Sequence, residues 1–100
     1  TKPQCDVFIA YSGEGTGETA FALAQKLRAS GIRTELEYNG RSFKAQFKQA
    51  GKYAAKYVAV IGSNELEAGL CNIKNMSTGT EEKVAMQDVC NYLSSQLIAE

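Results

Sequence analysis

The chain has 100 residues, of which 44% are hydrophobic and 9% aromatic. This is enough for one hydrophobic core and leaves no room for a second domain. Its 11 Lys and Arg balance 11 Asp and Glu, and the pI is near 6.2, which argues against a protein that holds nucleic acid by overall charge alone. No apolar run approaches the ~20 residues of a membrane span, and the N-terminus TKPQCD lacks the apolar core of a signal peptide.

The first half of the chain alternates strand and helix patterns. Residues 5–11 are a β-rich run, and residues 16–30 carry apolar side chains at helical spacing before Gly31, which is expected to end that helix. Residues 32–38 alternate between apolar or hydroxyl side chains and charged ones. This alternation predicts a strand with one wetter face, at an edge of the sheet.

A basic helix and a buried strand follow. The segment from Arg41 to Lys56 contains no acidic residue. Its basic residues are Arg41, Lys44, Lys48, Lys52 and Lys56. A helix over residues 42–54 places the lysines in one row beside an apolar stripe that includes Phe43 and Phe47. By itself such a row is typical of a solvated helix face. Residues 57–61 (YVAVI) are uniformly apolar, which predicts a central strand buried on both faces.

The second half breaks this alternation. We expect an acidic surface turn over residues 63–69, strands over 70–76 and 80–86 around a turn at Ser77 to Gly79, and a closing helix over 87–97. The predicted fold is α/β, a three-layer α/β/α arrangement with a five-stranded mixed sheet and three helices. Its first three strands are parallel and lie in the order second, first, third.

The cysteines and the absence of histidine limit the chemistry. Cys5, Cys71 and Cys90 are far apart, with no Cys-x-x-Cys pair and no histidine to help bind a metal. They are typical of reduced core thiols in a cytoplasmic protein. Without histidine, Ser-His and Cys-His nucleophilic catalysis is excluded within this chain, and we expect no catalytic residue and no metal site.

Three segments, residues 11–17, 38–43 and 62–67, should meet at the carboxyl ends of the parallel strands, where open α/β sheets bind ligands. The first, YSGEGTG followed by Glu18 and Thr19, resembles the FMN-phosphate loop of flavodoxins. Glu14 and Glu18 would lie where the phosphate binds. A tight turn with Thr16 as helix N-cap is the other interpretation, so a flavodoxin-like FMN-binding module is the alternative function.

From Asp6 to Leu97 the chain resembles the C-terminal anticodon-binding domain of class II aminoacyl-tRNA synthetases, most of all that of histidyl-tRNA synthetase. The resemblance is carried by RSFKAQFKQA (41–50), AKYVAVIG (55–62) and ELEAG (65–69), followed by Lys74 and the Thr78-Gly79 turn. The threonyl, prolyl and glycyl enzymes share the domain. A stand-alone accessory or interaction domain with the same fold is a further alternative.

The resemblance implies a noncatalytic domain, residues 1–100, of a longer synthetase. Its partner would be tRNA, here the anticodon loop of tRNA-His, with no cofactor in this domain. ATP and Mg²⁺ would belong to a separate catalytic domain, so this chain alone should not aminoacylate. The parent would be a cytoplasmic homodimer without membrane contact, and the isolated domain a monomer.

The same resemblance implies a set of tRNA-binding residues. Arg41, Lys44 and Lys48 would contact phosphates or bases, and Tyr38 and Phe43 could stack on bases. Asn39, Asn64 and Glu65 would read base edges, and Lys74 would face the anticodon. We expect Asn39, Arg41, Asn64, Glu65 and Lys74 to converge on one edge of the sheet.

Overall fold

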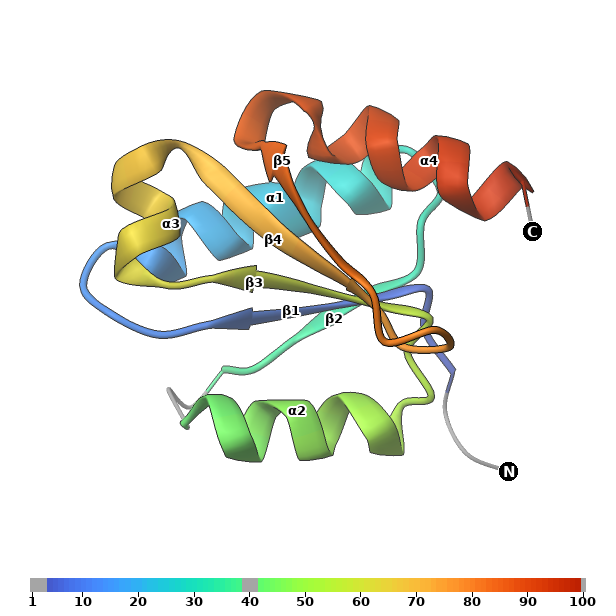
Figure 1. The fold of residues 1–100 in the computed structure, drawn as a ribbon, viewed down its shortest axis with the longest axis horizontal. Coiled ribbons are helices and arrows are strands. Elements are labelled where there is room, and N and C mark those ends of the chain that lie inside the picture. Colours follow the sequence, from blue (N-terminus) through green and yellow to red (C-terminus); the bar gives the residue numbers. More distant parts are fainter. Residues whose placement is uncertain (1–3, 39–41, 100) are drawn as a thin grey trace.

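The computed structural model describes residues 4–38 and 42–99 of the chain. They form three layers, with the sheet between helices α1 and α4 on one face and helix α2 on the other (Figure 1). This is the α/β class and the layering that the element order predicts.

The sheet has five strands, in the order β2-β1-β3-β4-β5. The bounds are β1 Val7–Tyr11, β2 Thr34–Leu36, β3 Tyr57–Ile61, β4 Leu70–Asn75 and β5 Glu81–Ala85. The first three strands are parallel, and β4 and β5 are antiparallel to their neighbours. The predicted order of the first three strands is therefore confirmed, as are the central position of β3 and the edge position of β2.

Strand β2 is shorter than predicted, because the expected alternation stops after Leu36. Glu37 is only 3% exposed, whereas Tyr38, which the alternation places on the inner face, is 62% exposed. The hydroxyl of Tyr11 donates a hydrogen bond to the main-chain oxygen of Glu37, just after the strand.

Four α-helices are described: α1 Thr16–Ala29, α2 Phe43–Lys52, α3 Ser63–Ala68 and α4 Val89–Ala99, the last preceded by the short 3-10 helix η1 Met86–Asp88. The acidic turn predicted over residues 63–69 is wrong, because this stretch forms α3. Glu65 Oε1 accepts a hydrogen bond from the Gly62 main-chain N–H at 2.8 Å, which caps the start of α3, and Gly69 ends the helix with a φ of 71°.

The start of α1 also differs from the prediction. The N-cap residue is Gly15, with a φ of 80°, and not Thr16. Thr16 is the first helical residue, and its buried hydroxyl donates to the main-chain oxygen of Gly13 at 2.6 Å. A left-handed N-cap is accessible to glycine at little cost, so the turn needs no side-chain cap.

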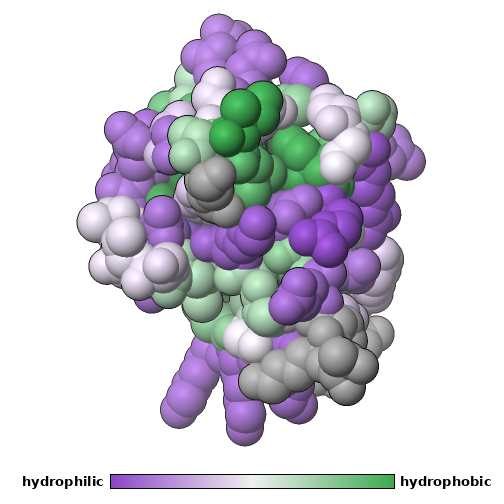
Figure 2. Space-filling model, turned by 90° about the vertical axis from the view of Figure 1, so that its right-hand side faces the viewer, coloured by the Kyte–Doolittle hydropathy of each residue, from purple (hydrophilic) through white to green (hydrophobic). Residues whose placement is uncertain are grey.

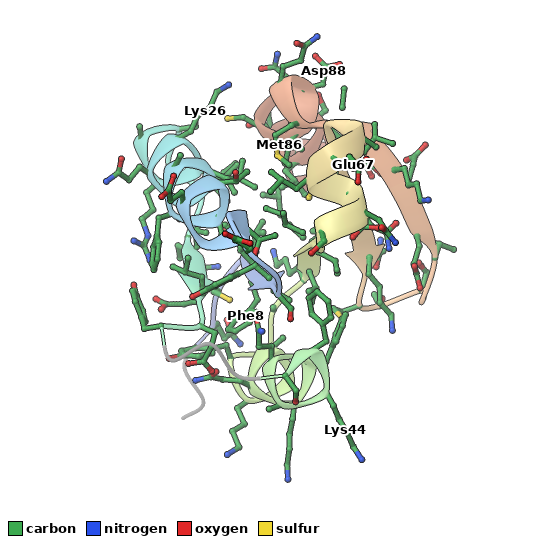
Figure 3. All side chains as sticks on the ribbon, turned by 90° about the vertical axis from the view of Figure 1, so that its left-hand side faces the viewer. Phe8, Lys26, Lys44, Glu67, Met86 and Asp88 are labelled. Carbon is green, nitrogen blue, oxygen red and sulfur yellow. The ribbon has the colours of Figure 1, made fainter. Side chains whose placement is uncertain are left out.

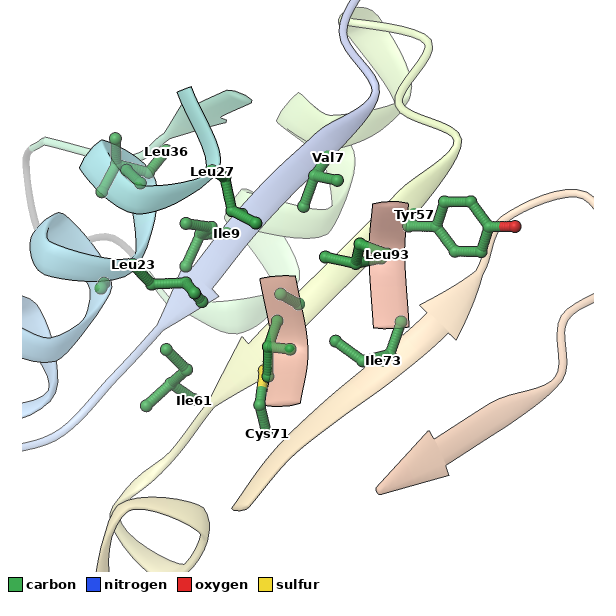
Figure 4. Close-up of a cluster of buried hydrophobic side chains, with 14 of the residues drawn as sticks. Val7, Ile9, Leu23, Leu27, Leu36, Tyr57, Ile61, Cys71, Ile73 and Leu93 are labelled. Atoms are coloured by element: carbon green, nitrogen blue, oxygen red, sulfur yellow. The ribbon is translucent and has the colours of Figure 1, made fainter. Parts of the chain in front are cut away.

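The larger core lies between the sheet and the α1–α4 layer (Figure 4). There Leu23 and Leu27 of α1 and Leu93 of α4 pack on the inward residues of β1, β3 and β4. The smaller core lies under α2, where Ala50 packs with Phe8 and Val58. Burying an apolar side chain of this size contributes about 1.5–3 kcal/mol, so both faces of β1 and β3 stabilise the fold.

The end of α2 carries an alanine where a glycine is usual. Ala54 has a φ of 53°, and the bonds from Ala55 N to Ala50 O and from Ala54 N to Gly51 O, both 3.1 Å, close a Schellman motif. Gly51 lies inside the helix, where an added Cβ would meet nothing within 4 Å.

Exchanging these two residue types should stabilise the protein. We expect about 1 kcal/mol from Gly51→Ala and a similar gain from Ala54→Gly, because each removes a conformational penalty. Urea unfolding followed by circular dichroism measures both. Gly31→Ala is the matched control and should destabilise, because Gly31 closes α1 with a φ of 83°. A loss of stability in Ala54→Gly would contradict this interpretation.

Candidate nucleic-acid interface

One face of the β4–β5 half of the sheet is left open. Cys71 and Ile73 of β4 point into the larger core, so Asn72 and Lys74 point to the opposite face, on the side of α2. In the strand register Asn72 lies opposite Lys83, and Lys74 lies opposite Glu81. Helix α2 packs over β1 and β3, whereas Glu81 and Lys83 are exposed and Asn72 and Lys74 are half-buried. We call the surface formed by Asn72, Lys74, Glu81 and Lys83 the open face.

Helix α2 forms a wall beside the open face. Phe43 and Phe47 are half-buried against the smaller core, while Lys44 and Lys48 are exposed. Seen from the carboxyl ends of the parallel strands, Lys44 projects away from the sheet while Phe8 lies between the sheet and α2 (Figure 3). Hydrophilic side chains also project from the lower end of the molecule, at the level of α2, when it is seen from the opposite side (Figure 2).

A cation–π contact joins the wall to the open face. The Lys74 ammonium lies 5.5 Å from the centroid of the Phe47 ring. Within the described residues, Lys44, Lys48, Lys74 and Lys83 make no ion pair. The lysine charges of α2 and of the open face are therefore available to an anionic ligand.

The start of α3 lies beside the start of α2, near the end of β3. A Cβ on Gly62 would lie 3.7 Å from Cζ of Phe43, so α3 begins directly beside the start of α2. Asn64 is exposed there, and Glu65 is half-buried with its Oε1 bound to the Gly62 N–H. The hydrogen bond fixes the Glu65 carboxylate in orientation, as a reader of base edges requires.

Lys74 does not lie at the edge where it was expected. It pairs with Val58, near the start of β3, whereas α3 begins after Ile61 at the end of β3. Three residues along a strand correspond to about 10 Å. The expectation that all five readers converge on one edge is therefore wrong for Lys74. The candidate surface is a face that runs from the start of α3 down to Lys74.

Tyr38 lies on the other side of the sheet, beyond β2. Its ring centroid is 5.7 Å from that of Phe21, which is 6.1 Å from that of Tyr11. Because β1 and β3 separate β2 from β4, these two strands are about 14 Å apart. The structure therefore does not bring Tyr38 together with Lys74. Asn39 and Arg41 lie outside the described residues.

The glycine-rich loop before α1 packs against α3. An added Cβ on Gly13 would clash with Oγ of Ser63, and the φ of 115° at Gly13 is a backbone conformation that favours glycine. The Thr16 hydroxyl is turned to the Gly13 oxygen, and Glu14 and Glu18 are exposed around the helix start. This geometry supports the tight-turn interpretation of the loop.

Gln46 is a structural residue that sequence reasoning missed. It is fully buried at 0% exposure, its Oε1 accepts from Tyr11 N at 2.9 Å, and its Nε2 donates to Tyr11 O at 2.7 Å. The pairing of β1 with β2 ends at Ile9 and Leu36, so Gln46 takes the place of a strand partner for Tyr11. The signal in the sequence was a polar residue at the centre of the apolar stripe of α2.

Asn72, Glu81 and Lys83 were missed as well. In the sequence, polar residues alternate along β4 and β5. Only the strand register shows that Asn72, Glu81 and Lys83 lie together on one face of the sheet.

The three cysteines are buried and free. Burial raises the pKa of Cys5 to about 11 and that of Cys71 to about 12, so both stay protonated at neutral pH. No group of residues that could hold a metal ion occurs within residues 4–38 and 42–99. The thiols therefore behave as core residues.

In the part of the chain that the structure describes, no helix is both long enough and apolar enough to cross a membrane.

Comparisons with known proteins identify the fold. The family model described as anticodon binding domain matches residues 6–96. Histidine–tRNA ligase of Caldicellulosiruptor bescii is 42% identical over 91 residues, 91% of this chain and 22% of the relative. That of Bacillus cytotoxicus is 41% identical over 93 residues, 93% of this chain and 22% of the relative. The chain thus spans about a fifth of the length of the curated relatives it matches.

Solved structures agree with these relatives. Apo histidyl-tRNA synthetase of S. aureus superposes with a TM-score of 0.85 at 36% identity, over 90% of this chain and 26% of that one. The RNA binding domain of threonyl-tRNA synthetase from Cryptosporidium parvum superposes with a TM-score of 0.80 over 91% of this chain and 23% of that one. At 18% identity, the second comparison shows the fold alone. The family match and the superposition over 90% of this chain together lead to one conclusion: the chain belongs to the anticodon binding domain family, and it resembles the member of that family found in histidyl-tRNA synthetases.

Proposed function

We propose that this chain is the tRNA-recognition part of a histidyl-tRNA synthetase and that it binds the anticodon stem-loop of tRNA-His across the open face. The observation that carries the proposal is the position of Lys74, which joins the basic wall of α2 to the open face through its contact with Phe47 at 5.5 Å. A splayed RNA loop needs phosphate-binding charges beside a surface of polar side chains, and this surface provides both.

The residues divide by chemistry. Lys44 and Lys48 are exposed and suit phosphate contacts, and Lys74 suits a contact to phosphate or base. Asn64 and Glu65 suit hydrogen bonds to base edges at the start of α3. Phe43 is half-buried against the smaller core, so it can offer a base only the exposed edge of its ring.

The remaining contacts are proposed from the resemblance. Asn39 and Arg41 would act from the connection before α2. Tyr38 would act only on a nucleotide that passes the β2 side of the domain.

The parent protein would supply the chemistry. Aminoacylation, with ATP and Mg²⁺, would belong to the rest of a longer, homodimeric and cytoplasmic synthetase, of which this chain is one domain. Isolated, the chain should be monomeric and should not aminoacylate tRNA.

Fluorescence anisotropy with a labelled tRNA-His anticodon stem-loop tests the proposal. The competitor has the same stem and a scrambled loop. We expect tighter binding to the cognate loop by at least about tenfold, the discrimination that one well-placed pair of hydrogen bonds provides. Equal binding to both hairpins would show that charge alone holds the RNA.

Glu65 offers a sharp test of base reading. Glu65→Gln removes a negative charge but keeps an oxygen that can accept from the Gly62 N–H. If the carboxylate reads a base, cognate binding should weaken by roughly tenfold, with little change on the scrambled loop. Pure electrostatics predicts tighter binding to both.

Glu67→Gln is the matched control for this variant. It makes the same charge change on the same helix at an exposed side chain. A similar effect of both variants would remove Glu65 from the set of base readers.

A further inference from the structure

We infer that Asn72 and Glu81 form an acceptor pair on the open face that selects a guanine base. This inference rests on the proposed function, because it assumes that unstacked RNA bases reach the open face. It adds two residues from neighbouring strands and the base that they distinguish.

The orientation of the pair follows from its chemistry. Asn72 Nδ2 lies 2.7 Å from Glu81 Oε1. A carboxylate only accepts hydrogen bonds, so the side-chain amide of Asn72 must turn its NH₂ group toward Glu81. Asn72 Oδ1 is thereby directed away from that bond. The hydrogen bond fixes an otherwise rotatable amide, with Oδ1 and the second N–H of the amide left free.

The pair therefore presents acceptors to a ligand. Among the described residues, neither Asn72 Oδ1 nor Glu81 Oε2 has a hydrogen-bond partner. Guanine carries two neighbouring donors, N1–H and the N2 amino group, on its Watson–Crick edge. The same edge of adenine, cytosine or uracil mixes one donor group with acceptors. Two free acceptors on side chains that one hydrogen bond joins thus suit guanine and repel the acceptors of the other bases.

Lysines on both sides make a carboxylate tolerable beside RNA. Lys74 lies opposite Glu81 and Lys83 opposite Asn72, on the same face of the sheet. Two positive charges next to one negative charge leave the surface attractive to phosphates. The lysines would hold the backbone, and the acceptor pair would read the base between them.

Hairpins with one stem and a uridine loop test the inference. The loop carries a single guanosine, adenosine, cytidine or inosine, placed at each position in turn, and affinity for the chain is measured by anisotropy. We expect the best guanosine hairpin to bind about tenfold more tightly than its adenosine counterpart. Inosine lacks the N2 amino group and should fall between the two.

Two variants locate the reader. Glu81→Gln and Asn72→Val should each reduce the guanosine preference to within about twofold while the affinity for the all-uridine hairpin changes little. The matched control is Glu82→Gln. Glu82 is the next residue of β5, lies on the opposite face, and accepts from the Tyr92 hydroxyl at 2.6 Å. It should leave the preference unchanged.

The outcomes separate the inference from the proposed function. If the chain binds the tRNA-His stem-loop but shows no guanosine preference, or keeps the preference in both variants, the inference is overturned and the proposed function stands. If the chain binds neither the tRNA-His stem-loop nor any hairpin, both fail together. Preference for guanosine that is lost in both variants and kept in Glu82→Gln supports the inference.

Discussion

Replacing Gln46 by leucine should destabilise the protein by about 3 kcal/mol, because it leaves two buried main-chain groups of Tyr11 without their partners. The leucine fits the apolar surroundings but can neither accept from the N–H nor donate to the oxygen. For a domain of this size the melting temperature should fall by more than about 10 °C. Urea or thermal unfolding followed by circular dichroism measures the change.

Gln49→Leu is the matched control on the same helix. Gln49 Oε1 is buried and has no hydrogen-bond partner among the described residues. Replacing an unpaired polar group with an apolar one should be neutral or stabilising. If the two variants lose the same stability, the two hydrogen bonds between Gln46 and the Tyr11 main chain are not what attaches α2 to the end of β1.

The double variant Lys44→Ala, Lys48→Ala should weaken RNA binding without unfolding the protein, because both side chains are exposed. Each lost phosphate contact flattens the plot of log affinity against log salt by about 0.7–0.9. The slope should therefore change by about 1.4–1.8, and the loss of affinity should be largest at low salt. Anisotropy titrations at several salt concentrations measure both quantities.

Lys26→Ala is the control for charge alone. Lys26 is exposed near the end of α1, in the layer on the far side of the sheet from α2. It should leave the slope unchanged. An unchanged slope in the double variant would assign the lysines of α2 to an ordinary solvated helix face.

Periodicity was sufficient for most of the architecture. The uniform apolar run 57–61 became the buried central strand, and the helical spacing before Gly31 became α1 with its glycine end. Periodicity does not predict helix α3 within residues 63–69, because six helical residues carry too few apolar positions to show a period. Their helix depends on a side-chain cap from Glu65 to Gly62 that the composition does not reveal.

The candidate site depended on long-range register, which one sequence does not contain. Lys74 was expected at the edge formed by the carboxyl ends of the parallel strands. Antiparallel pairing of β4 with β3 instead places it opposite Val58, near the start of β3. Tyr38 looked like part of the site, yet its position beyond β2 puts it against Phe21. The partners Asn72 and Glu81 are nine residues apart in the chain and meet only across two strands.

Mapping of the bound RNA tests the central claim most directly. In a ¹H–¹⁵N correlation titration with the tRNA-His anticodon stem-loop, the largest amide shift changes should fall on α2, on the start of α3, and on β4 and β5 around Lys74 and Lys83. The amides of α1 and α4 should change little, because these helices lie on the other face of the sheet. Shift changes centred on α1 and α4, with the open face unaffected, would contradict the proposed binding surface.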